Sequence, residues 1–328
     1  MRNPNSLKWL HGSRAIRWAA VLGLALGAIS DTAAAAPRNA SQASEVPVHM
    51  VVTVKPHHGG NVPAMSADDV KVYLAGKPNQ VTGFVPLQGD RAGLQLFILI
   101  DETSRDTIGL HFQSIANFIE EQPATTAIAV GYMRNGMVVT VQDLTKDHAL
   151  AAKSLRLPLG AAVGYTSPYL ALTDLMKKWP VTEDRREILM ITSGIDPLGG
   201  GFESNPFENP YLEEAFDRAQ RGGFIVYVIY MPGSGFPARG FFRTTLAQTG
   251  LDMVAQKTGG ETYNLYLGNP VDIDPYLRAL SYNLNHQYQL TFLAPAANKP
   301  RLEPVKVKTE MSNAVLVTAE AGYVGTGM

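Results

Sequence analysis

The sequence predicts an α/β fold: a mostly parallel sheet with helices on both faces, inserted in or flanked by a small β-sandwich-like module. Two observations predict it. Between residues 91 and 286, short apolar runs alternate with segments whose apolar residues recur at helical spacing. The two flanks, 46–90 and 287–328, show only strand patterns. Each flank is too small to bury a core alone, so we expect them to pair with each other. Two separate β appendages remain the alternative.

The beginning of the chain has the features of an export signal. Basic residues precede an apolar stretch, "WAAVLGLALGAIS" (18–30), and the small residues of "TAAAAP" follow it. This stretch is of signal-peptide length and short for a membrane span. We expect residues 1–36 to be a cleaved signal peptide and residues 37–45 a flexible leader, in a periplasmic or secreted protein. An uncleaved amphipathic anchor is the alternative.

Composition limits the classes of function. The chain has 328 residues, of which 45% are hydrophobic and 17% charged, as in globular proteins. The net charge of −1 leaves no basic footprint for nucleic acid. There is no cysteine, which excludes disulfides, a thiol nucleophile and cysteine-ligated zinc. No segment beyond the signal is long and apolar enough to cross a membrane.

The flanks are predicted as strands from alternating or β-branched runs. In the first flank, Val-rich alternation predicts a strand at 46–55, and 68–87 predicts two strands around a Gly-Lys-Pro turn. In the second flank, strand patterns cover 288–295, 303–310 and 314–324.

The α/β segment opens with the continuous apolar run 95–100, which is typical of a strand covered on both faces. Asn135-Gly136 predicts a hairpin that adds one antiparallel edge strand, 137–143, to the strand 127–133. Further strands are predicted at 186–194, 224–231 and 261–266. Helical spacing and closing glycines predict helices at 108–121, 148–155, 167–179, 209–223, 244–260 and 272–287.

Polar residues gather where several of these strands end. Asp101 and Thr103 follow the first strand, Thr166 opens a helix, and Ser193 and Asp196 follow the strand 186–194. Ligands of open α/β sheets bind beyond the carboxyl ends of the strands. Carboxylates and hydroxyls are oxygen donors of the kind that a hard divalent cation takes. The sequence therefore predicts a candidate ion site at this edge.

Four short segments resemble, in order, the motifs of von Willebrand factor type A (VWA) domains: "FILIDETSR", "GYTSPYLAL", "ILMITSGID" and "AQKTGGETY". The flanks resemble those of exported VWA-related proteins common in Acidobacteria. The resemblance implies a Rossmann-like domain that binds Mg²⁺ through an Asp-x-Ser-x-Ser segment, a threonine and a second aspartate. Asp101, Thr103 and Thr166 match ligand positions of this pattern.

The sequence departs from the pattern at two of the five ligand positions. Arg105 stands at the second serine, and Ser193 stands at the second aspartate. Arginine stays protonated and repels a divalent cation. We therefore expect Asp101 to pair with Arg105 or with solvent, and no cofactor to be required. A weak Mg²⁺ site, rescued by Ser104 or Asp196, remains open.

The long Gly/Pro/aromatic loop 196–210 adds exposed aromatic candidates. Phe202 and Phe207 would be partner contacts or would fold back as a lid. We expect a non-enzymatic protein-binding module for adhesion or scaffolding, whose unidentified protein partner meets Arg105, Ser193, Asp196, Phe202 and Phe207. The alternatives are a metal-dependent adhesin with a weak Mg²⁺ site, a structural envelope component, and an envelope hydrolase, for which the sequence provides no acid/base pair.

Overall fold

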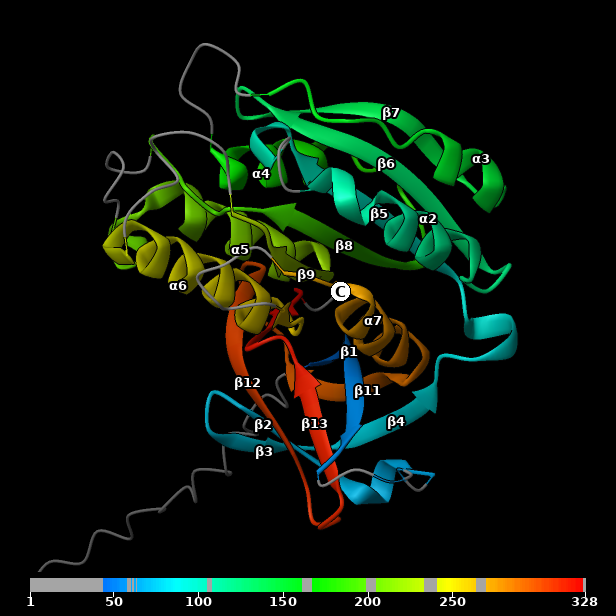
Figure 1. The fold of residues 1–328 in the computed structure, drawn as a ribbon. Helices are drawn as coiled ribbons and strands as arrows, with labels where there is room; N and C mark the ends of the chain where they lie inside the picture. Colours follow the sequence, from blue (N-terminus) through cyan, green and yellow to red (C-terminus); the bar gives the residue numbers. More distant parts are fainter. Residues whose placement is uncertain are drawn as a thin grey trace, which may run out of the picture. The chain divides into compact units, whose positions relative to one another are not determined.

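The computed structural model describes residues 44–326 apart from 58–59, 61, 63, 105–107, 161–166, 199–204, 233–240 and 264–269. The predicted signal peptide and most of the predicted leader therefore lie outside the described residues. Three sheets with the helices around the largest of them make up the described part, as Figure 1 shows.

The largest sheet has six strands in the order β10-β9-β8-β5-β6-β7. All neighbours are parallel except β7, which is antiparallel to β6 at the edge. The strands are β5 (Leu94–Asp101), β6 (Thr126–Arg134), β7 (Met137–Thr145), β8 (Arg185–Thr192), β9 (Phe224–Tyr230) and β10 (Thr262–Tyr263). Asn135 and Gly136 adopt positive φ angles in the β6–β7 turn, as the hairpin signal predicted.

Helices cover both faces of this sheet. Alternate residues of β5 face opposite cores, with Leu96 and Ile98 on one side and Phe97 and Leu99 on the other. The first core is completed by α2 (Phe112–Glu120), α3 (His148–Lys153) and α7 (Asp274–Asn285). The second is completed by α4 (Pro168–Lys178), α5 (Pro210–Gly222) and α6 (Phe241–Thr258). The predicted α/β class, with one antiparallel edge strand and helices on both faces, is confirmed.

Two four-stranded sheets enclose a separate core between them. Their orders are β13-β1-β11-β4 and β14-β12-β2-β3, and every pairing is antiparallel. The strands are β1 (Glu45–Pro56), β2 (Val70–Leu74), β3 (Lys77–Asn79), β4 (Val81–Pro86), β11 (Gln287–Pro295), β12 (Arg301–Thr309), β13 (Ala314–Thr318) and β14 (Ala321–Val324). Val52, Val72, Phe84, Phe292 and Val305 are among the buried residues of this core.

The two ends of the chain are interleaved in these sheets. β1 pairs with β11 from Glu45 opposite Pro295 to Thr53 opposite Gln287, so a strand near each end lies side by side. Two details differ from the sequence prediction. The segment 68–87 forms three strands, because the chain leaves the sheet of β2 after β3 and joins β11 as β4. The run 314–324 likewise splits into β13 and β14, which belong to different sheets.

Glycines fix the junction between α6 and the rest of the fold. Gly259 has a φ of +83°, and a Cβ there would lie 2.6 Å from the backbone nitrogen of Ala319, just before β14. A Cβ on Gly260 would overlap the carbonyl of Val226 in β9. The end of α6 therefore packs backbone against backbone on both sides, which no larger residue permits.

Candidate functional site

Asp101 ends β5 at the carboxyl edge of the parallel sheet, as the sequence predicted. Its side chain is 8% exposed. Oδ1 accepts a hydrogen bond from the backbone N–H of Thr103 at 2.9 Å, and Oδ2 accepts one from the hydroxyl of Thr192 at 2.7 Å. Burial raises the pKa of this carboxyl, while the hydrogen bonds from Thr103 and Thr192 work in the opposite direction.

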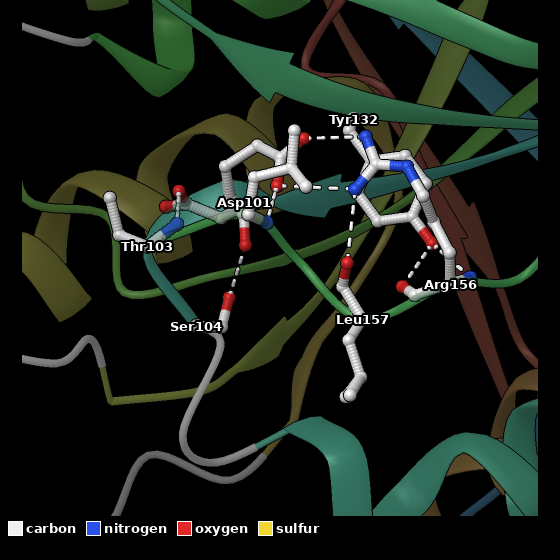
Figure 2. A network of polar contacts seen from close by, with 8 residues as sticks. Asp101, Thr103, Ser104, Tyr132, Arg156 and Leu157 are labelled. Carbon is white, nitrogen blue, oxygen red and sulfur yellow. Dashed lines mark hydrogen bonds and ion pairs between the residues drawn. The ribbon is translucent and has the colours of Figure 1, made fainter. Parts of the chain in front are cut away.

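The turn after Asp101 is fixed by further bonds. Ser104 is fully buried, and its hydroxyl donates to the backbone carbonyl of Asp101 at 2.7 Å. Ser104 is the last residue of the short 3-10 turn η3 (Glu102–Ser104), which follows Asp101 directly. Figure 2 shows the hydroxyl of Ser104 below the main chain of Asp101, with Thr103 to the left of Asp101. Ser104 thus supports the backbone of the turn.

Glu102 forms a buried ion pair that the sequence reading missed. Its carboxylate contacts both terminal nitrogens of Arg156, at 2.6 and 3.4 Å, and also accepts from the backbone N–H of Leu159. The Arg156 guanidinium lies 3.8 Å from the ring centroid of Tyr132 in β6. The hydroxyl of Tyr132 donates to the carbonyl of Arg156 and accepts from its N–H (Figure 2).

This network connects the Asp101 turn to the segment after α3. Glu102 stands 54 positions from Arg156 in the chain, so no local pattern indicates the pairing. The hydrogen bond to Glu102 raises the pKa of Arg156 further above its already high value, so the guanidinium is charged at neutral pH.

The second arm of the candidate site follows β8. Ser193 and Asp196 are each 5% exposed. Asp196 accepts from Asn209 Nδ2 at 2.9 Å and from the N–H of Leu198 at 3.1 Å. Because Asn209 also caps α5 through the N–H groups of Tyr211 and Leu212, its bond to Asp196 draws together the two ends of the loop 196–210. Asp196 therefore supports the loop.

Several predicted site residues are not covered by the structure. Arg105, Thr166 and Phe202 lie outside the described residues, as does the predicted pairing of Arg105 with Asp101. Phe207 is described, and its side chain is 76% exposed on η5 (Pro206–Glu208). The hydroxyl of Thr192, which the sequence reading treated as part of a motif, is the direct partner of Asp101.

The described donors do not make a divalent-ion site by themselves. In the described ranges no group of three or more His, Asp or Glu side chains lies close enough to hold a metal ion. Asp101 is the one carboxylate at a predicted ligand position, and each of its oxygens already accepts a hydrogen bond from the protein. A hard cation takes several oxygen ligands, so this donor set fits it poorly.

Exposed apolar side chains lie around the same edge of the sheet. Leu110 follows β5, Leu157 and Leu159 follow α3, and Phe207 precedes α5. Gly109 brings Leu157 close to the loop of Leu110, since a Cβ on this glycine would lie 3.0 Å from Leu157. Leu157 and the loop of Leu110 therefore bring exposed apolar side chains together, and patches of this kind are typical of interaction surfaces.

Among the comparisons with known proteins, the one with solved structures found similar chains. No protein-family model and no curated protein matches the chain. A von Willebrand factor type A protein from Catenulispora acidiphila is 12% identical with a TM-score of 0.40, over 87% of this chain and 75% of that one. The vWF domain of the type V pili tip protein Mfa5 from Porphyromonas gingivalis is 11% identical with a TM-score of 0.44, over 59% and 95%.

BatB, a conserved hypothetical protein from Bacteroides thetaiotaomicron, is 16% identical with a TM-score of 0.39, over 58% of this chain and 97% of that one. At such identities a likeness concerns the fold alone, and what those proteins do is not carried over to this chain. No helix in the described part is both long and apolar enough to cross a membrane.

Proposed function

We propose that this chain is an exported, non-enzymatic VWA-type module that binds a protein partner at the carboxyl edge of its parallel sheet, and that its metal site is degenerate. The observation that carries the proposal is the state of Asp101. Each of its two carboxylate oxygens accepts a hydrogen bond from the protein, one from Thr103 N–H and one from the Thr192 hydroxyl, so the chain itself supplies part of the compensation that an ion would provide.

The exposed side chains at this edge support a protein partner. Phe207 and the leucines 110, 157 and 159 offer apolar surface, and aromatic residues of this kind are frequent anchors of protein interfaces. Arg105 would add a cation for an acidic group of the partner. The partner would then be bound through apolar contacts and the guanidinium of Arg105, in place of a metal ion shared between the two proteins.

The surroundings of four described histidines, His49, His111, His148 and His286, support a non-enzymatic role. His148 and His286 each contact a backbone carbonyl, at 2.8 and 2.7 Å, and His49 contacts the hydroxyl of Thr291 at 3.1 Å. His111 is buried, and burial lowers its pKa. None of these rings is bonded to a serine, as a nucleophile and its base would be. Assays with ester, peptide and glycoside panels test this point, and turnover that Asp101→Asn abolishes would refute it.

Calorimetric titration with Mg²⁺, Mn²⁺ and Ca²⁺ tests the degenerate site. We expect no binding by the wild-type protein and a gain of binding by the Arg105→Ser, Ser193→Asp double variant, which restores a hydroxyl and a carboxylate. Micromolar binding of a divalent ion by the wild type would contradict the proposal and favour a metal-dependent adhesin. The retained Asp101 and Thr103 are the observations that favour this alternative.

Capture from an envelope extract tests the binding face. We expect Phe207→Ala to weaken capture of the same partner that the wild type retains. The control is Val181→Ala, which removes a fully exposed apolar side chain just before β8, at the opposite edge of the sheet. Equal loss in both variants, or no loss in either, would exclude this face.

A further inference from the structure

A cavity lies at the amino edge of the parallel sheet, opposite the edge that carries Asp101. It has a volume of about 360 Å³ and is lined where β8 and β9 begin, where α5 and α6 end, and along β1 and β14. This size is at the lower end of the range for small-molecule sites, ~300–1,000 Å³. The candidate site at Asp101 is at the other end of the same strands, so the cavity is separate from it.

Small residues keep the cavity open. Gly222, Gly223, Ala319, Ala321 and Gly322 line it, and none carries a side chain larger than a methyl group. A Cβ on Gly222 would lie 2.5 Å from the ring of Phe224, so this glycine lets the ring lie flat against the end of α5. The glycine at 223 has a φ of +64°, which ends α5 and turns the chain into β9.

Arg186 supplies a cation to this cavity. Its guanidinium carbon lies 4.8 Å from the centroid of Phe224, and the side chain is partly buried. Across the described residues no carboxylate pairs with it, and no hydrogen bond holds it. Burial lowers the pKa of Arg186 while nearby Glu183 raises it, and an arginine remains charged in either case. The side chain therefore has donors to offer to an anion.

The other lining groups have the same sign of charge or none. Arg221 and His49 are on the wall, and no aspartate or glutamate is among the lining residues. Arg221 bonds to Asp217 at 2.8 Å on its outer side, which partly offsets its charge. The apolar part of the wall includes Phe224 and Tyr323, whose side chain is 42% exposed. A guanidinium on an aromatic ring presents a planar fork that matches a carboxylate.

We propose that this cavity binds a small aromatic carboxylate, with the carboxylate on Arg186 and the ring between Tyr323 and the glycine-lined floor. The charge of the wall selects an anion, and the small volume with flat apolar surfaces selects an aromatic body over a bulky one. The proposal does not depend on the function proposed for the carboxyl edge.

Binding of 3-phenylpropionate to the full chain, compared with the neutral 3-phenylpropionamide, tests the proposal. The chain has three tryptophans, and Trp9→Phe with Trp18→Phe leaves Trp179, whose ring lies 5.1 Å from that of Phe224. We expect the carboxylate to bind by calorimetry and to change the Trp179 emission, and the amide to bind about tenfold more weakly or less, since it cannot form the charged pair.

Variants assign the effect to the cavity. Arg186→Gln is expected to weaken carboxylate binding about tenfold or more. Arg278→Gln is the control, because it removes the same charge from an exposed position on α7 away from the cavity. Arg186→Lys, which keeps the charge but loses the fork, is expected to fall between them, and it serves if the glutamine variant does not fold. Absence of binding at millimolar concentration, equal affinity for acid and amide, or unchanged affinity in the folded Arg186 variants would each overturn the proposal.

Discussion

Glu187 provides a sharp test of the energetics at the amino edge of the sheet. It lies in β8 and its side chain is 0% exposed. Within the described residues no group stands in good hydrogen-bond geometry to either carboxylate oxygen, although Gln287 and Tyr227 lie close enough to favour the charged form. The nearest cation is Arg185, 3.8 Å away, and its nitrogens also bond to the carbonyls of Ala92, Gly93 and Leu284. A buried carboxylate with so little compensation is costly to ionise.

Burial raises the pKa of Glu187 from 4.5 to about 7, although Arg185, Gln287 and Tyr227 lower it in part. A difference of one pH unit corresponds to about 1.4 kcal/mol, so the charged form costs the folded state about 3 kcal/mol. Below pH 4.5 the group is neutral in both states and costs nothing. From there to pH 7 the unfolded chain binds fewer protons than the folded one, and the free energy of unfolding falls. Above pH 7 the full cost remains.

Glu187→Gln removes the titration and keeps the shape. We expect the variant to gain stability relative to the wild type by about 3 kcal/mol more at pH 8 than at pH 4.5. Urea unfolding followed by circular dichroism, at several pH values, measures this difference, and the other titrating groups cancel in it. The control is Glu120→Gln at the exposed end of α2, with an expected change below about 0.5 kcal/mol. A difference that stays flat with pH, or one that favours the wild type at pH 8, would refute the reasoning.

Two substitutions test other parts of the framework. Glu102→Gln leaves the Arg156 guanidinium beside Tyr132 without its carboxylate. Because Arg156 is 32% exposed, we expect the free energy of unfolding, measured in urea, to fall by about 2 kcal/mol, which is less than the full cost of breaking a buried pair. An unchanged free energy of unfolding would show that water screens the pair. Gly260→Ala places a methyl group against the carbonyl of Val226 and is expected to lower the melting temperature sharply. Gly325→Ala is the control, because nothing lies within 4 Å of a Cβ at this position, and we expect its melting temperature to stay unchanged. Similar melting curves for the two variants would contradict the packing described for Gly260.

The fold was predictable where the pattern is local. The continuous apolar run at Leu96–Ile100 marks a strand buried on both faces, and Asn135-Gly136 marks the hairpin that reverses the sheet edge. The splitting of 68–87 into β2, β3 and β4 was not predictable. Each of the three has a strand pattern, and the change of sheet between β3 and β4 is set by the distant strand β11.

The position of the candidate site could be predicted from the sequence, but the hydrogen bonds and the ion pair within it could not. The position of Asp101 at a strand end follows from the apolar run before it. Its partner Thr192 stands 91 positions away, and the partner of Glu102 stands 54 positions away, so both bonds depend on the folded sheet. One signal was present in the sequence, because Glu187 is a charged residue inside the strand pattern 186–194, which indicates a carboxyl carried into the core.

If the site is degenerate, as we propose, the bonds around Asp101 are what would keep the turn ordered. In the described turn, the N–H of Thr103, the hydroxyl of Thr192 and the hydroxyl of Ser104 each bond to Asp101, and Glu102 ties the same turn to Arg156. These contacts come from the chain itself, so we expect them to persist when divalent ions are removed. A turn held in this way has no need of a second aspartate, so a serine at position 193 costs the fold little. The edge of the sheet is then free to use its exposed apolar side chains for contact, and the chelator EDTA is expected to leave the melting temperature unchanged.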